Sequence, residues 1–135
     1  MAPPTSSRSA APLTTRAEVG FWLAVVLAVA DIAGAFAPLP ADGEPGPPLV
    51  VMVFCAVMGL VTLAAAVVVA RTGSRVGIRV IAVARILAAI TSLPAFFVPD
   101  VPPPFVAWGA ATVVLTVVAV VLLMSRTRAR VRAEA

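Results

Sequence analysis

The chain has 135 residues, of which 61% are hydrophobic and 12% are charged. Soluble domains use about 45–50% apolar and 25% charged residues, so this composition argues against a soluble enzyme, a nucleic-acid-binding domain and a secreted disulfide-rich domain. The formal net charge of +4 comes from arginines at the ends of apolar segments rather than on one exposed face, so we expect the lipid bilayer as a partner and no nucleic acid.

Four apolar segments follow one another along the chain, at residues 19–37, 49–70, 80–98 and 105–124. Each is close to the ~20 residues that a helix needs to cross the ~30 Å hydrocarbon core of a bilayer. Backbone polar groups inside lipid must be paired within their own segment, so all four segments are predicted as helices. The predicted fold is an all-α membrane protein, a bundle of four transmembrane helices over residues 19–124.

Residues 1–18 come before the first helix and are rich in Pro, Ser, Thr and Ala, which predicts a disordered segment. The first apolar segment also has an interpretation as a cleaved signal peptide, because arginines precede it and Ala-Phe-Ala at 35–37 fits a cleavage pattern. The length of the segment, Asp31 inside it and Pro38 directly after it favour a helix that stays in the membrane.

The connections between the helices differ in charge. Residues 38–48 and 99–104 are rich in proline and carry only acidic charges, whereas residues 71–79 (RTGSRVGIR) and the tail at 125–135 are basic. Nine arginines lie in the N-terminal segment, in 71–79 and in the tail, and none lies in the other two connections. The positive-inside rule therefore predicts that both termini face the cytoplasm, in a multi-pass protein of the bacterial cytoplasmic (inner) membrane. Most of the tail is predicted to be disordered.

Small residues recur at helical spacing in every predicted helix, as close helix packing in lipid requires. The first two stripes are Gly20, Ala24, Ala28, Asp31 and Ala35, then Cys55, Gly59, Thr62, Ala66 and Ala70. The third helix has two stripes, Ala82, Arg85, Ala89 and Ser92, and Ala84, Ala88, Thr91 and Ala95. The fourth stripe is Gly109, Thr112, Thr116 and Ala119. These stripes predict the faces through which the helices contact one another.

Polar residues on these stripes form the candidate intramembrane site, which comprises Asp31, Arg85, Cys55, Thr91 and Thr112. From a rise of 1.5 Å per residue, Asp31, Cys55, Thr91 and Thr112 are predicted about 9–10 Å from the outer ends of their helices. A second layer, at about 16–20 Å, is predicted to contain Arg85, Thr62 and Thr116. Ionisable groups inside a membrane are costly to insert, so Asp31 and Arg85 are the residues to explain.

Three interpretations of Asp31 follow. It is a packing element that is either protonated or hydrogen-bonded to Thr91 and Thr112, it forms an ion pair with Arg85, or it couples protons or cations to transport. The predicted depths of Asp31 and Arg85 differ by about 9 Å, a gap that the arginine side chain only partly closes. For Arg85, the alternative is that its side chain snorkels toward the cytoplasmic surface.

The residue types that carry most catalysis are scarce. The sequence has no His, no Tyr and no Lys, which removes the commonest general base and nitrogen metal ligand. Cys55 is the only cysteine, so there is no intrachain disulfide. We therefore expect no catalytic residues, no metal, no cofactor and no enzymatic activity.

The loop RTGSRVGIR and the following VIAVARILAAITSLPAFF resemble the middle of many small four-helix integral membrane proteins of GC-rich bacteria. This resemblance implies a location and an architecture, and no activity. The layout also resembles that of small multidrug-resistance exporters, which have four short helices and an essential carboxylate in the first. That resemblance gives Asp31 the role of the carboxylate. The chain departs from it in carrying aspartate in place of glutamate, in having no aromatic residue between 80 and 93, and in its strong arginine asymmetry.

The sequence thus favours a non-enzymatic accessory or scaffold component of the membrane. Its expected partners are the lipid bilayer and other membrane proteins or a second copy of the chain. The alternative is a small proton-coupled exporter or a channel-like oligomer that uses Asp31.

Overall fold

The computed structural model describes residues 13–134, with side chains described for 13–125. The described part is helical and contains no strand: α1 is Thr15–Gly34, α2 is Leu49–Thr72, α3 is Arg75–Ser92, a short 3-10 helix η1 is Leu93–Phe96, and α4 is Pro103–Glu134. Four spans are long and apolar enough to cross a membrane, namely Thr15–Gly34, Leu49–Thr72, Arg75–Phe96 and Pro103–Ser125. This confirms the predicted all-α bundle of four helices with membrane-spanning length.

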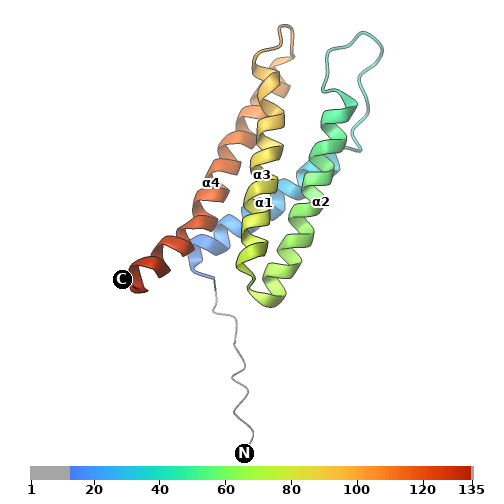
Figure 1. Ribbon diagram of the computed structural model, residues 1–135. Helices are drawn as coiled ribbons and strands as arrows, with labels where there is room; N and C mark the ends of the chain where they lie inside the picture. The colour runs from blue at the N-terminus through green and yellow to red at the C-terminus, as the bar shows by residue number, and fades with distance from the viewer. Residues whose placement is uncertain (1–12, 135) are drawn as a thin grey trace, which may run out of the picture.

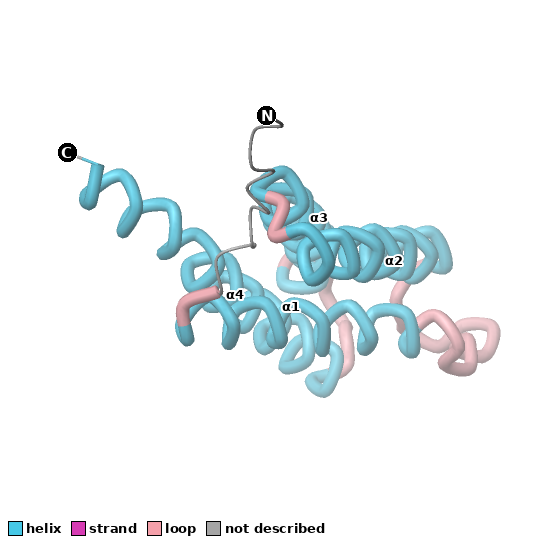
Figure 2. The backbone as a smooth tube through the Cα atoms, turned by 90° about the horizontal axis from the view of Figure 1, so that it is seen from below, coloured by secondary structure: helices cyan, strands magenta, loops and turns pink. Residues whose placement is uncertain are grey.

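The four helices form a closed ring. α1 packs against α2 and α4, and α3 packs against α2 and α4, while α1 and α3 lie diagonally across the ring. In Figure 1, α1 crosses obliquely behind α3, and the view from below in Figure 2 shows α1 beside α4 and α2 beside α3. The connections at 35–48 and 97–102 lie at one end, here named the loop end. The tight connection between α2 and α3 lies at the other end, here named the turn end.

Local chemistry sets the helix boundaries at the turn end. The Thr14 hydroxyl accepts a hydrogen bond from the Ala17 backbone N–H at 3.4 Å, which caps the start of α1. Gly73 ends α2 with a left-handed backbone (φ 62°) that glycine adopts without a steric penalty. Ser74 then caps α3 by accepting from the Gly77 N–H at 3.2 Å. Two residues therefore suffice to reverse the chain.

The helix bounds correct several expectations. α1 begins at Thr15, so the predicted disorder does not apply to residues 15–18, and the remainder of that prediction, at 1–12, lies outside the described residues. The α-helical part of α3 ends at Ser92 rather than at 98, because Pro94 lacks an N–H and the chain continues as η1. α4 continues to Glu134 rather than giving way to a disordered tail, since Ala and Arg are good helix formers and no Gly or Pro interrupts them.

The core consists largely of the predicted small-residue stripes. Their buried members include Gly20, Ala24 and Ala28 in α1, Gly59, Thr62 and Ala66 in α2, Ala82, Ala84, Arg85, Ala88 and Ala89 in α3, and Gly109, Thr112, Thr116 and Ala119 in α4. Most of the larger apolar side chains, chiefly Val, Leu and Ile, are exposed, although a few, such as Ile81 and Leu123, fill the core. This arrangement of small residues inside and branched apolar residues outside is typical of helices that pack within lipid.

Candidate functional site: a buried ion pair between α1 and α3

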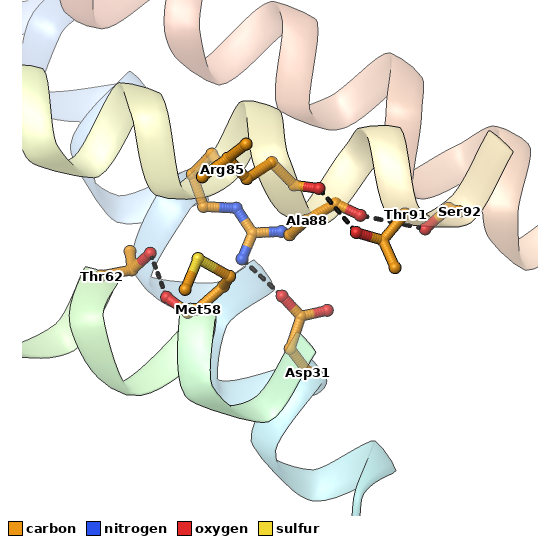
Figure 3. A network of polar contacts seen from close by, with 8 residues as sticks. Asp31, Met58, Thr62, Arg85, Ala88, Thr91 and Ser92 are labelled. Carbon is orange, nitrogen blue, oxygen red and sulfur yellow. Dashed lines mark hydrogen bonds and ion pairs between the residues drawn. The ribbon is translucent and has the colours of Figure 1, made fainter. Parts of the chain in front are cut away.

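The central polar feature of the bundle is an ion pair across the ring. Arg85 on α3 donates from Nη1 to Oδ2 of Asp31 on α1, at 2.5 Å (Figure 3). The Arg85 side chain is fully buried, and 12% of the Asp31 side-chain surface remains accessible. A charge-assisted hydrogen bond of this kind is stronger than one between neutral groups, and its surroundings here are apolar. The pair therefore links two helices that make little other contact.

The contact between α1 and α2 sets the depth of Asp31. A Cβ atom built on Gly59 would lie 3.5 Å from the Cβ of Asp31 and 2.7 Å from the backbone oxygen of Ala28, so Asp31 lies beside Gly59. Gly59 is ten residues after the start of α2 at Leu49, which is about 15 Å along the helix. Only three residues of α1 follow Asp31, so α1 ends about 10 Å short of the start of α2.

The helices on the other side of the ring bring polar groups to the same level. A Cβ atom on Gly109 would lie 3.8 Å from the Ser92 backbone oxygen, which aligns α4 with α3. α3 and α4 run in opposite directions. Seven residues before Ser92 on α3 is Arg85, and seven residues after Gly109 on α4 is Thr116, so these two residues lie at one level. Thr62 on α2 and Arg85 are each eleven residues from the Gly73–Ser74 turn.

One residue from each helix thus forms what we name the polar layer: Asp31, Thr62, Arg85 and Thr116. Thr62, Arg85 and Thr116 are all buried. The sequence predicted a layer of Arg85, Thr62 and Thr116 but assigned Asp31 to a shallower one. The polar layer is the only place in the described bundle where charged side chains meet across the core.

Most polar side chains near the layer are satisfied within their own helices. Thr62 and Thr91 donate to the carbonyl oxygens of Met58 and Leu87, both at 2.8 Å, and Ser92 donates to Ala88 at 3.3 Å (Figure 3). Such bonds from a residue to the carbonyl four positions earlier use the one proton of the hydroxyl, so no donor remains for a neighbouring helix. Three buried atoms differ, because Arg85 Nε, Arg85 Nη2 and Thr116 Oγ1 have no hydrogen-bond partner among the described residues.

The structure brings together only part of the predicted site. Asp31 and Arg85 meet, and so the geometry is that of the ion-pair interpretation rather than of a snorkelling arginine. Thr91 bonds within α3 and Thr112 is buried on α4, and no hydrogen bond joins either to Asp31 in the described part of the chain. Cys55 is half-buried on α2, one turn closer to the loop end than Gly59.

Sequence reasoning placed Thr62 and Thr116 at the right level but left them out of the candidate site. Their signal was their position on the small-residue stripes, one turn from Gly59 and Thr112 respectively. Among the described residues, no group of three or more His, Cys, Asp or Glu side chains lies close enough to hold a metal ion.

Comparisons with known proteins add no relative. No protein-family model, curated protein or solved structure matches the chain. The geometry of the bundle and its polar layer therefore supply the basis for a functional proposal.

Proposed function

We propose that the chain is a non-enzymatic accessory or scaffold component of the bacterial cytoplasmic membrane, with the lipid bilayer and other membrane proteins or a second copy of itself as partners. The observation that carries this proposal is the enclosed Asp31–Arg85 ion pair, which joins diagonal helices α1 and α3. The pair is satisfied when Asp31 and Arg85 lie at one level on opposite sides of the ring, and so it favours the observed order and register of the helices. A rigid, apolar-sided bundle suits a component that other membrane proteins pack against.

A proton-coupled exporter or channel-like oligomer is the second candidate function. Its support is that Asp31 retains some accessible surface and that two Arg85 nitrogens have no hydrogen-bond partner within the described residues. Exporters need a carboxylate that is reached from the membrane surface and can change its charge during the transport cycle.

Proton flux into liposomes distinguishes the two proposals. We expect liposomes that contain the purified full chain, loaded with a pH-sensitive dye, to acidify no faster than empty liposomes after an imposed proton gradient. Acidification that requires the protein and disappears in Asp31→Asn would contradict the scaffold proposal and support the exporter. The Asp31→Asn protein must be shown to insert before its flux is compared.

The arginine asymmetry supports an orientation with both termini in the cytoplasm. Arg71, Arg75 and Arg79 are exposed at the turn end, where α1 also begins, and none lies in the connections at the loop end. Each short basic segment favours the cytoplasmic side.

Reporter fusions test this orientation. A fluorescent protein that folds only in the cytoplasm is expected to fluoresce when fused after Ala135 or inserted at Gly73–Ser74. Alkaline phosphatase, which is active only outside, is expected to be active when inserted between Gly43 and Glu44. The reverse pattern, with an external reporter active after Ala135, would refute the assignment.

A further inference from the structure

Three buried polar atoms are unused by the ion pair. Arg85 donates from Nη1 to Asp31, and its Nε and Nη2 have no partner in the described part of the chain although the side chain is fully buried. Thr116 Oγ1 is likewise buried and unpartnered, on the helix that packs against α3 at the same level. Buried polar groups in proteins are nearly always hydrogen-bonded, and an unmade bond to a charged group is especially costly. A bound ligand that forms hydrogen bonds with these three atoms would remove this cost.

The donor chemistry of the three atoms, which lie at one level on the adjacent helices α3 and α4, limits the chemistry of that ligand. The N–H groups of Nε and Nη2 lie along one edge of the planar guanidinium and match two oxygens of a planar anion. The Thr116 hydroxyl is a third donor, buried at the same level on the adjacent helix α4. All three groups can donate, and so they fit a ligand that accepts hydrogen bonds.

We propose that the Nε/Nη2 edge of Arg85 and the Thr116 hydroxyl bind a small monovalent oxyanion, and that Asp31 takes up one proton when the anion binds. The scaffold function requires only the Arg85–Asp31 contact, so this site goes beyond it. The anion accepts from Nε, Nη2 and Oγ1, while Nη1 stays within reach of the neutral carboxylic acid.

Charge balance couples the two events. Asp31 and Arg85 together are neutral, and an added anion alone would leave one uncompensated negative charge in an apolar interior, which is strongly unfavourable. A proton from water that binds to Asp31 restores neutrality, because Arg85 then balances the anion. Few other groups interfere. Near this level, Cys55 is the only titratable side chain of α2 and Arg85 is the only one of α3, and α4 has none between Pro103 and Ser125.

Nitrate is a suitable probe because it is small, planar and monovalent. The purified full chain in detergent micelles is titrated with sodium nitrate at several pH values, with sodium gluconate at equal ionic strength as the reference. We expect nitrate to bind more tightly than gluconate, with one proton taken up per nitrate as measured with an indicator dye. The apparent affinity is expected to fall about tenfold for each unit of pH increase over the range in which Asp31 is ionised.

Matched threonine variants locate the site. Thr116→Val removes the third donor and is expected to weaken nitrate binding about tenfold, the equivalent of one hydrogen bond. Thr62→Val removes a buried hydroxyl of the same polar layer that is already committed to Met58, and it is expected to leave the affinity within twofold of the original. Equal affinities of the two variants would overturn the proposal.

Variants of the charged pair test the coupling to the proton. Asp31→Asn mimics the neutral acid, so its nitrate affinity is expected to lose its pH dependence, and nitrate is expected to stabilise it more than it stabilises the original chain. The double variant Asp31→Asn, Arg85→Gln carries no charge in the layer and is expected to fold without binding nitrate. If the original chain binds nitrate no better than gluconate, the three atoms are satisfied by internal water and the anion site is refuted. That result would leave the scaffold proposal intact, because the scaffold is judged by flux and folding.

Discussion

Replacing Asp31 by leucine is expected to destabilise the folded bundle by about 3–5 kcal/mol, the cost of leaving one partner of a buried ion pair alone. Arg85 is fully buried, and its only hydrogen bond to another side chain in the described residues is the one to Asp31. Arginine does not lose its proton in proteins, so its charge would remain inside the bundle without a counter-charge. Asp31→Asn is expected to be nearly as harmful, since an amide supplies an acceptor but no charge. The free energy of unfolding is measured by reversible denaturation in mixed micelles.

The companion variants separate the ion pair from simple packing. Arg85→Met is expected to cost less than Asp31→Leu, because a buried carboxylate left alone can take up a proton and become neutral. The double variant Asp31→Leu, Arg85→Met is expected to recover most of the stability, since a buried ion pair replaced by apolar groups is often neutral or stabilising. A double variant that is as unstable as the sum of the two single variants would show that the residues do not act as a pair.

The buried faces that form the polar layer could be predicted from the sequence, whereas the depth of Asp31 could not. The small-residue stripes predicted which faces are buried, because close approach in lipid requires small side chains and leaves a regular signal. The depth of Asp31 was predicted less well, because counting residues from the helix ends assumed that all four helices end at the same level. In the structure α1 ends closer to the turn end than the point where α2 starts, and Pro94 shortens the α-helical part of α3. Both effects bring Asp31 and Arg85 closer than the predicted gap of about 9 Å.

Hydrogen bonding within helices explains why the predicted threonine ligands of Asp31 are not used. Thr91 donates to the Leu87 carbonyl of its own helix, as any helical threonine can. Counting residues along a helix gives the depth of a threonine but not its hydrogen-bond partner. Thr112 is buried on α4 but one turn closer to the loop end than Thr116, which shares the level of Arg85. Whether a threonine faces a charge depends on the rotation and alignment of each helix, and the stripes alone do not define these within one turn.

The close contact between α1 and α2 at Gly59 makes the stability of the bundle sensitive to any larger residue at this position. A Cβ atom at this position would lie 2.7 Å from the Ala28 backbone oxygen and 3.0 Å from Cγ1 of Ile32. The Ala28 oxygen belongs to the backbone of a helix and cannot move aside alone, so α1 and α2 must separate. We expect Gly59→Ala to destabilise the bundle by about 1–3 kcal/mol, the usual cost of overpacking a core.

Gly34→Ala provides the matched control, because Gly34 is also helical and a Cβ atom there would meet nothing within 4 Å. We expect the free energy of unfolding of that variant to equal or slightly exceed that of the original chain, since alanine is the better helix former. Asp31 lies beside Gly59, so separating the helices also draws Asp31 away from Arg85. The loss from Gly59→Ala is therefore expected to be smaller in the background of Asp31→Leu, Arg85→Met, where no ion pair remains to be stretched. An equal loss in both backgrounds would show that the contact at Gly59 and the ion pair stabilise the bundle independently.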